Sequence, residues 1–358
     1  MRTQKKSFLQ DWIHKERIPG KVQAWFSIPL DPQLCDFRLI QVQRGSKKML
    51  SIEATVPKIS PPVVVLDIYE QLRKEHLQVL RNSISQIWFR AIGEGSYALL
   101  IQANINTSLI AKAYKSFLFF LKKTHPEILC CHRVQSATLF DPSNPYKARL
   151  KLDYGPTLLP LAGSPFYFHI LDWTPYCKST WLKLPERIKN FIHPSKDDCL
   201  LEFHAASAYI GASLAPYFKS VDTVDSFEYS KISAQKNASK IKSLYVHQEV
   251  LNEKFLQNFF SKQIGESKWT ILLNPPTTQR LNRKIISILV GCRPERILLI
   301  TGDLESASKN IKAFRQEGFM LRKTLPIDTN PNSNHFELAF LFVPDRANLL
   351  GKVKLKQG

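Results

Sequence analysis

Short apolar runs alternate with helical patterns through the second half of the chain. Four runs have the length and apolar content of buried strands: residues 200–203, 221–224, 269–273 and 296–300. Residues 210–218 and 305–317 have helical patterns, and Gly318 closes the second of them. Strands that alternate with helices predict an α/β domain with a doubly wound, mostly parallel sheet over residues 166–358.

The first half has a different pattern, in which groups of strands are separated by single helices. Strands are predicted at residues 22–28, 38–43, 49–55, 87–91, 97–102, 128–139 and 149–152. Helices are predicted at residues 1–20, 66–80 and 111–123. We therefore expect residues 1–165 to form an α+β domain with an antiparallel sheet. One face of that sheet should be basic, because basic residues are interleaved with its first strands: Lys21, Arg38, Arg44, Lys47 and Lys48.

The chain carries a large excess of positive charge, with a net charge of +20 over 358 residues. Residues 1–165 hold 23 basic and 12 acidic side chains, and residues 166–358 hold 27 and 18, so the excess is spread over both halves. A basic field of this kind favours a polyanion partner, either nucleic acid or an anionic membrane face. The absence of a lipidation motif favours nucleic acid, although a generally basic proteome would produce the same charge.

Cysteine usage and hydropathy indicate the compartment. The six cysteines form no Cys-x-x-Cys pair, which in a chain of this length indicates buried thiols in a reducing cytosol and no metal site. No run of eighteen apolar residues is present, and residues 1–21 lack the apolar region of a secretory signal. The sequence thus predicts a cytoplasmic protein, and it indicates nothing about oligomeric state.

The predicted strand at residues 269–273 ends abruptly at Asn274-Pro275-Pro276-Thr277. Neither proline can donate to a strand ladder, and Pro275 biases Asn274 away from helix. The Asn274 side chain is therefore held at the carboxyl end of a strand, where open α/β sheets bind their ligands. A proline-rich turn that only ends a strand would give the same four residues.

A second motif follows at fixed spacing, formed by Asp328, Pro331, His335 and Glu337. Together with the Asn-Pro-Pro turn before it, this motif resembles the carboxyl-terminal half of the RNA 5-methyluridine (uracil-5) methyltransferases. That family carries Asp-Pro-Pro-Arg, then Ser-Cys-Asn-Pro, then Asp-x-x-Pro-x-Thr-x-His-x-Glu. The resemblance implies a class I, Rossmann-like methyltransferase domain that uses S-adenosylmethionine (AdoMet), preceded by a domain that cradles RNA. The family's amino-terminal OB-type domain and iron–sulfur cluster have no counterpart in the sequence.

The same resemblance assigns a donor site. Glu202 takes the position of the family's first Asp, Asp225 that of the acid that accepts hydrogen bonds from the ribose hydroxyls, and Glu249 that of an acid facing the adenine amine. Ala206 and Ala208 take both glycine positions of the Gly-x-Gly turn. Glycine serves there for positive φ and close approach to the ligand, and a Cβ in that conformation costs roughly 1–2 kcal/mol. We therefore expect weak or absent AdoMet binding.

The catalytic positions are altered as well. In the family a cysteine thiolate adds to the uracil ring and a glutamate later removes a proton. Glu337 keeps the base position, but Gly302 stands at the nucleophile position and cannot form the covalent bond. Asn274 replaces the family's Asp, Thr277 the Arg that follows, and Pro175 the Gln of a segment that touches the cofactor.

Three functions remain open on this reading. The first is a protein that binds ribosomal or transfer RNA on a methyltransferase scaffold, either still methylating a base or with catalysis lost. The second is a methyltransferase that acts on an exocyclic base amine, from which Asn274 would accept a hydrogen bond. The third is an assembly factor that contacts a protein partner.

Overall fold

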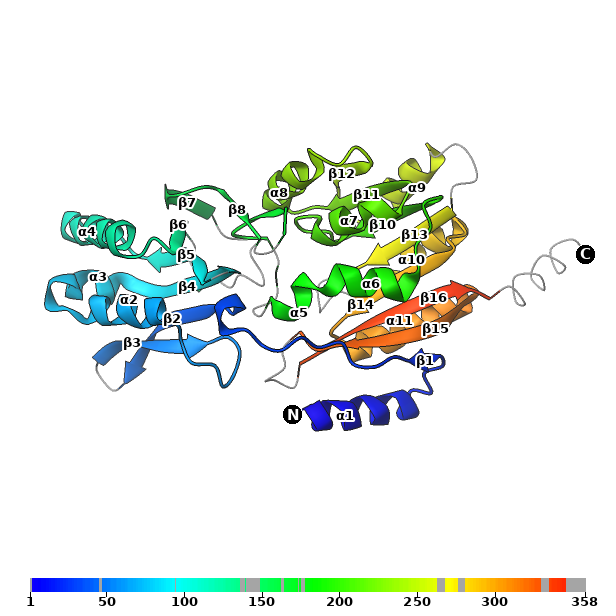
Figure 1. Ribbon diagram of the computed structural model, residues 1–358, viewed down its shortest axis with the longest axis horizontal. Coiled ribbons are helices and arrows are strands. Elements are labelled where there is room, and N and C mark those ends of the chain that lie inside the picture. Colours follow the sequence, from blue (N-terminus) through cyan, green and yellow to red (C-terminus); the bar gives the residue numbers. More distant parts are fainter. Residues whose placement is uncertain are drawn as a thin grey trace, which may run out of the picture. The chain divides into compact units, whose positions relative to one another are not determined.

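The computed structural model describes residues 2–44, 47–93, 95–135, 139, 149–161, 164–172, 174, 178–262, 268–275, 281–329 and 335–345 (Figure 1). The chain divides into two compact units. Unit 1 comprises Met1–Ile28 and Thr180–Gly358, and unit 2 comprises Pro29–Ser179. This division differs from the predicted boundary at residue 165 at both ends of unit 2.

The amino-terminal segment joins unit 1 because its backbone extends the sheet there. Strand β1 (Lys21–Val22) pairs in parallel with β15 (Phe319–Ile327), and Phe26 forms a further bridge to Ile327. The sequence predicted a longer strand at 22–28 within the first domain. A two-residue strand has too short a pattern to reveal its partner.

Residues 166–179 join unit 2 because a buried cluster of charges holds them. The Lys178 ammonium lies 2.7 Å from the Asp36 carboxylate, and both side chains are fully buried. The Arg90 guanidinium lies 2.9 Å from the same carboxylate and donates to the carbonyl of Ile170 at 3.1 Å. Removing one partner of such a buried pair is strongly destabilising, so this segment is firmly held.

Unit 1 contains an eight-stranded sheet with the order β1-β15-β16-β14-β13-β10-β11-β12. The remaining strands are β10 (Asp198–Phe203), β11 (Ser220–Asp225), β12 (Leu244–Gln248), β13 (Lys268–Leu273), β14 (Arg296–Thr301) and β16 (Glu337–Pro344). All neighbours pair in parallel except β16, which is antiparallel to β14 and β15. The predicted mostly parallel sheet is confirmed.

Helices cover both faces of this sheet (Figure 1). One face packs against α1 (Arg2–Lys15), α9 (Glu253–Ser261), α10 (Arg283–Gly291) and α11 (Leu304–Gln316), through a core that includes Leu201 and Phe203. Helix α7 (Tyr209–Leu214) lies on the other face, where Gly211 approaches Glu202, Val221 and Thr223. The other helices of the unit are α5 (Ser179–Leu182), α6 (Leu184–Ile192) and α8 (Glu228–Ala238). The sheet is therefore doubly wound, as predicted.

Unit 2 contains a six-stranded sheet with the order β3-β2-β4-β5-β6-β7. Its strands are β2 (Phe37–Arg44), β3 (Lys47–Ala54), β4 (Ile84–Gly93), β5 (Ser96–Ala103), β6 (Ile128–Gln135) and β7 (Arg149–Tyr154). The sheet is antiparallel as expected, except that β5 and β6 are parallel. A helix connects these two strands, and such a crossover is how parallel neighbours are joined. A separate pair, β8 (Leu158–Pro160) and β9 (Tyr167–His169), completes the unit.

Three helices pack on one face of this sheet: α2 (Val63–Arg73), α3 (Gln78–Ser83) and α4 (Ser108–Thr124). The helix predicted at 66–80 is broken at Lys74, which is extended with ψ 145°. Leu66 is 41% exposed, and Val65 and Ile68 fill the core instead.

No helix in the described residues is long and apolar enough to cross a bilayer. Cysteines 35, 130, 131 and 199 are buried free thiols and Cys292 is a half-buried one. Cys177 lies outside the described residues.

Candidate functional site

The carboxyl ends of the parallel strands in unit 1 meet at one edge of the sheet. Phe203, the last residue of β10, pairs with Val224 and with Leu273. Asp225 and Asn274 come directly after these two partners, and the Asn274 amide donates to the carbonyl of Phe203 at 3.3 Å. Asp225 and Asn274 therefore flank the end of the same strand.

The catalytic positions lie at the same edge. Thr301 pairs with Leu338, so the next residue pair in this antiparallel register is Gly302 opposite Glu337. Glu337 is also paired with Ile327, at the carboxyl end of β15. The sheet thus brings the predicted base and nucleophile positions to adjacent strands.

The turn after β10 keeps a backbone that glycine would favour. His204, Ala206 and Ala208 all have positive φ, of 56°, 46° and 58°. The Asn237 amide donates to the carbonyl of Ser207 at 2.8 Å and holds the turn in place. Residues other than glycine keep a positive φ only where the surrounding structure imposes that conformation, and such residues cluster at binding sites.

The two alanines of this turn have different surroundings. Ala208 is 0% exposed, so its methyl group is packed inside the protein. Ala206 is half-buried, so its methyl group is the one that can face a ligand. Of the two alanines at the predicted glycine positions, only Ala206 is thus partly exposed.

The acidic side chains also divide into two kinds. The Asp225 carboxylate accepts hydrogen bonds from the backbone amides of Ala206 at 2.9 Å and Phe227 at 2.8 Å, one on each oxygen. Each carboxylate oxygen can accept a second bond, so hydroxyl groups can still be bound there. Glu249 is exposed, and its backbone amide donates to the carbonyl of Asp225 at 3.1 Å. Both carboxylates lie at the edge where a ligand would bind.

Glu202 lies beneath the turn and faces α7. Its carboxylate accepts from the Gly211 amide at 2.9 Å. Burial raises the pKa of Glu202 to about 8, so the side chain is largely protonated at neutral pH. Its position supports the turn and the start of α7, which is a different role from contact with a ligand.

His204 was not identified from the sequence as a site residue. Its Nε2 atom is buried and has no hydrogen-bond partner in the described structure. Burial lowers the pKa of His204, while the neighbouring Asp225 charge opposes that shift. A buried polar atom without a partner is uncommon and indicates a missing water or ligand atom. Near the same turn, a cavity of about 10 Å³ lined in part by Ala206 and Asp225 is just large enough for one water, but His204 is not among its lining residues.

Glu337 has the properties of a base. Its side chain is 7% exposed and makes no hydrogen bond or ion pair with the described residues. Burial raises the pKa of Glu337 to about 7. A general base works best when its pKa lies near the operating pH.

The nucleophile position is filled by another side chain. A Cβ atom added at Gly302 would lie 2.9 Å from Cε1 and 3.2 Å from Nε2 of His335. The imidazole of His335 thus occupies the space that a cysteine at residue 302 would need.

Asn274 is half-buried, and its side-chain amide has no hydrogen bond with the part of the chain that the structure describes. Pro275 beside it is buried. Pro276, Thr277 and Pro175 fall outside the described residues.

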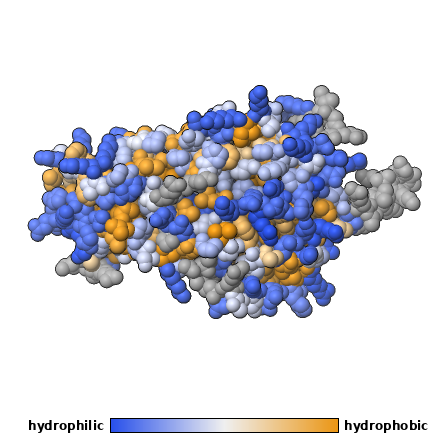
Figure 2. All heavy atoms as spheres, viewed as in Figure 1, coloured by the Kyte–Doolittle hydropathy of each residue, from blue (hydrophilic) through white to orange (hydrophobic). Residues whose placement is uncertain are grey.

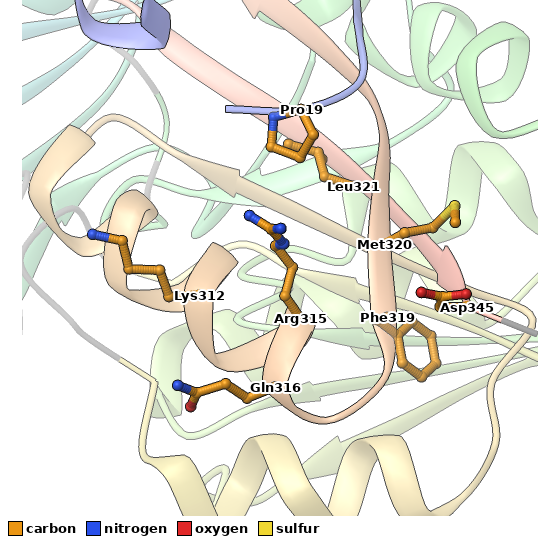
Figure 3. A pocket seen from close by; sticks show the side chains of 8 residues that line it. All are labelled: Pro19, Lys312, Arg315, Gln316, Phe319, Met320, Leu321 and Asp345. Atoms are coloured by element: carbon orange, nitrogen blue, oxygen red, sulfur yellow. The ribbon is translucent and has the colours of Figure 1, made fainter. Parts of the chain in front are cut away.

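A larger cavity among the described residues of unit 1 lies elsewhere. It has a volume of about 600 Å³ and is lined in part by Lys312, Arg315, Phe319 and Asp345 (Figure 3). Phe319 begins β15 and Asp345 follows the antiparallel β16, so this cavity is at the amino edge of the sheet. It does not belong to the site formed by Asp225, Asn274 and Glu337.

Comparison with known proteins identifies the relatives of this chain. An RNA methyltransferase of Chlamydia trachomatis, itself uncharacterised, is 28% identical over 155 residues, which are 43% of this chain and 38% of that protein. A second uncharacterised RNA methyltransferase, from Caldanaerobacter subterraneus, is 24% identical over 156 residues, which are 43% of this chain and 33% of that protein. This chain is related to RNA methyltransferases.

The chain thus matches little more than a third of the length of these curated relatives. No protein-family model matches it. The solved structure of the Pyrococcus abyssi tRNA (uracil-54, C5)-methyltransferase, in complex with S-adenosyl-L-homocysteine, aligns with 93% of this chain and 81% of its own. The TM-score is 0.65 at 12% identity, which confirms the class I methyltransferase fold of this relative of RNA methyltransferases.

Proposed function

We propose that this protein binds RNA on a methyltransferase scaffold and cannot methylate uracil through a covalent cysteine intermediate. The observation that carries the proposal is the glycine at residue 302, with the His335 side chain beside it. Glycine offers no nucleophile, and the Cβ of any other residue there would lie 2.9 Å from Cε1 of His335, so the imidazole would have to move. The carboxylate of Glu337 at the base position does not replace the cysteine nucleophile. In the covalent mechanism the base removes a proton only after the nucleophile has bonded to the uracil ring.

RNA is the expected partner on grounds of charge and relationship. The net charge of +20 is spread along the whole chain, which suits a polyanion. The related proteins carry the name RNA methyltransferase. Ribosomal or transfer RNA, or another structured RNA, would fit the same charge.

AdoMet binding belongs to the same proposal. Asp225 and Glu249 would accept hydrogen bonds from the ribose hydroxyls and the adenine amine, and Nε2 of His204, which has no hydrogen-bond partner among the described residues, offers one more polar contact. The Ala206 methyl group narrows this site, so we expect binding weaker than in enzymes with glycine there.

Two measurements on the full chain test the proposal. Binding to transcribed transfer and ribosomal RNA should weaken steeply with salt, because phosphate contacts release counterions. RNA containing 5-fluorouracil should give no covalent adduct with the protein. A stable adduct would show that the covalent uracil chemistry is retained. An affinity for RNA that does not change with salt would show that the protein does not bind RNA through phosphates, and the RNA-binding proposal would be wrong.

A second candidate function has one specific observation in its favour. The side-chain amide of Asn274 is half-buried, makes no hydrogen bond with the described residues and is held at a strand end, in the position where base-amine methyltransferases accept a hydrogen bond from an exocyclic amine. Glu337, with a pKa of about 7, lies at the same edge and could take the amine proton.

Methyl incorporation from labelled AdoMet into unmodified RNA distinguishes the two candidates. Under the amine reading, Asn274→Ala and Glu337→Gln should each abolish incorporation. Under the main proposal no incorporation occurs, and Glu337→Gln should leave RNA affinity unchanged within about 0.5 kcal/mol.

A further inference from the structure

The outward face of α4 in unit 2 combines positive charge with an exposed aromatic ring. Lys112, Lys115 and Lys123 are exposed, and Phe119 is 68% exposed. The helix Ser108–Thr124 contains no acidic residue. We define these four residues as the α4 face.

The four side chains form one stripe. At 3.6 residues per turn, residues three, four or seven positions apart lie on the same side of a helix. Lys115 is four residues before Phe119, Lys123 is four residues after it and Lys112 is seven before it. The ring is thus at the centre of the stripe, and Lys115 and Lys123 lie about 12 Å apart along the axis, one on each side of it.

Folding requirements do not account for this arrangement. The helix already buries Tyr114, Phe117 and Leu121 in the core of unit 2, so Phe119 adds nothing to that core. Lysines at the carboxyl end of a helix are stabilised by its dipole, which covers Lys123 but neither Lys112 nor Lys115. Lys122 is engaged differently, with its ammonium 4.9 Å from the centre of the Tyr154 ring.

We propose that the α4 face binds single-stranded RNA, with Phe119 stacked on an unpaired base and the three lysines contacting phosphates. The proposal rests on the proposed RNA-binding function and names the surface that carries it. An exposed ring flanked by cations is how single-strand binding proteins hold bases and backbone together. Bases in a duplex are already stacked, so an aromatic side chain favours unpaired segments.

Charge and burial favour RNA over an anionic membrane. A helix that lies in a membrane interface inserts a broad apolar face among the lipids. The apolar face of α4 is occupied by the core of unit 2, which leaves Phe119 and Leu109 as its exposed large apolar side chains. The visible surface of this unit is mostly hydrophilic, with small hydrophobic patches (Figure 2).

The ring is tested with fluorescence anisotropy of the full chain and a labelled twelve-nucleotide oligouridine at fixed salt. Phe119→Ala should weaken binding by about 5- to 150-fold, the range measured for loss of one stacked base. Phe119→Trp should retain affinity, whereas Phe119→Leu should lose it, because leucine keeps apolar area without a ring. Leu109→Ala is the matched control on the same helix and should bind as wild type.

The lysines are tested by the salt dependence. Lys112→Ala/Lys115→Ala/Lys123→Ala should reduce the slope of log affinity against log salt by about 2, since each phosphate contact on a single strand contributes about 0.7. Lys236→Ala/Lys240→Ala/Lys242→Ala removes the same charge from unit 1 and should change the slope less. Equal effects of the two triple variants would overturn the assignment to α4.

The remaining outcomes separate this inference from the proposed function. If wild-type protein binds RNA and all Phe119 variants bind equally, the α4 face is refuted and RNA binding stands. If wild-type protein binds no RNA, both fail. If Phe119→Ala loses binding to phosphatidylserine vesicles but not to oligouridine, the face is a membrane contact and the inference is wrong.

Discussion

The ammonium of Lys5 lies 2.6 Å from the carboxylate of Asp328, and both side chains are buried. This contact joins the first helix to the start of the segment that leads to His335 and Glu337. Phe336 reinforces it, since its ring lies 6.4 Å from that of Phe8 and 5.3 Å from that of Trp25. The amino-terminal helix is therefore part of the support for the base position.

Removing the Lys5 charge should destabilise unit 1 strongly. Lys5→Met leaves the Asp328 carboxylate buried without its partner, and breaking a buried pair in this way costs about 3–5 kcal/mol. Lys6→Met, at the exposed neighbouring position, should cost less than about 0.5 kcal/mol. Urea unfolding of both variants measures the difference. Equal stability of the two would mean that Lys5 and Asp328 do not form a buried pair in solution.

The sequence predicted the sheet of unit 1 well, because β10, β11, β13 and β14 each have a short segment of strand length that is rich in apolar or strand-favouring residues, most clearly the apolar runs of β13 and β14. It did not reveal that the first 28 residues belong to this unit. The Lys5–Asp328 contact joins residues 323 positions apart, and no local pattern marks such a pair.

The candidate site shows the same limit. Asp225 and Asn274 were located because each follows a recognisable strand, and strand ends define an edge. The sequence could not separate Ala206 from Ala208, since burial depends on the packing of α7 against the sheet. Nor could it place His335 beside Gly302, because that approach depends on how the loop before β16 returns to the sheet.

The contact between Gly302 and His335 predicts a position-specific cost for any side chain at residue 302. Gly302→Ala should destabilise the protein by about 1–3 kcal/mol, because its Cβ would force the imidazole to move. Adding His335→Ala should remove most of that cost. Gly291→Ala is the control, since nothing lies within 4 Å of a Cβ there and alanine favours the helix by up to about 1 kcal/mol. Thermal unfolding of wild type, the three single variants and the Gly302→Ala/His335→Ala double variant gives these values, and a Gly302→Ala cost that His335→Ala leaves intact would contradict this account.

Burial of Glu202 predicts that stability falls as the pH rises. Its pKa is about 8 in the folded protein against an ordinary value of 4.5, so between these values the folded state holds a proton that the unfolded state has released. Stability should therefore decrease from pH 4.5 to 8, by up to about 5 kcal/mol in total, and be level above that.

Glu202→Gln isolates this effect. Glutamine can still accept from the Gly211 amide but does not ionise, so the variant should be more stable than wild type at pH 8 and similar at pH 4.5. Glu337 contributes with the same sign, but only up to its pKa of about 7. Urea unfolding at pH 7 and pH 8 therefore reports mainly on Glu202. A decrease between these two values that persists in Glu202→Gln would show that another group is responsible.

The different surroundings of Ala206 and Ala208 predict different results when each is returned to glycine. Glycine at either position relieves the strain of a positive φ, which stabilises the folded state by about 1–2 kcal/mol. The greater entropy of glycine in the unfolded chain offsets about 0.5–1 kcal/mol of this gain. Ala208→Gly also loses a buried methyl group worth about 0.8 kcal/mol, so its net effect on stability should be near zero.

Ala206→Gly should stabilise slightly and, by clearing the space beside Asp225, increase AdoMet affinity by tenfold or more, that is by about 1.4 kcal/mol. Calorimetric titration of both variants with AdoMet measures this. An equal increase in AdoMet affinity for Ala208→Gly and Ala206→Gly would show that both methyl groups face the ligand. If neither variant bound AdoMet, the assignment of Asp225 to the ribose hydroxyls would be wrong.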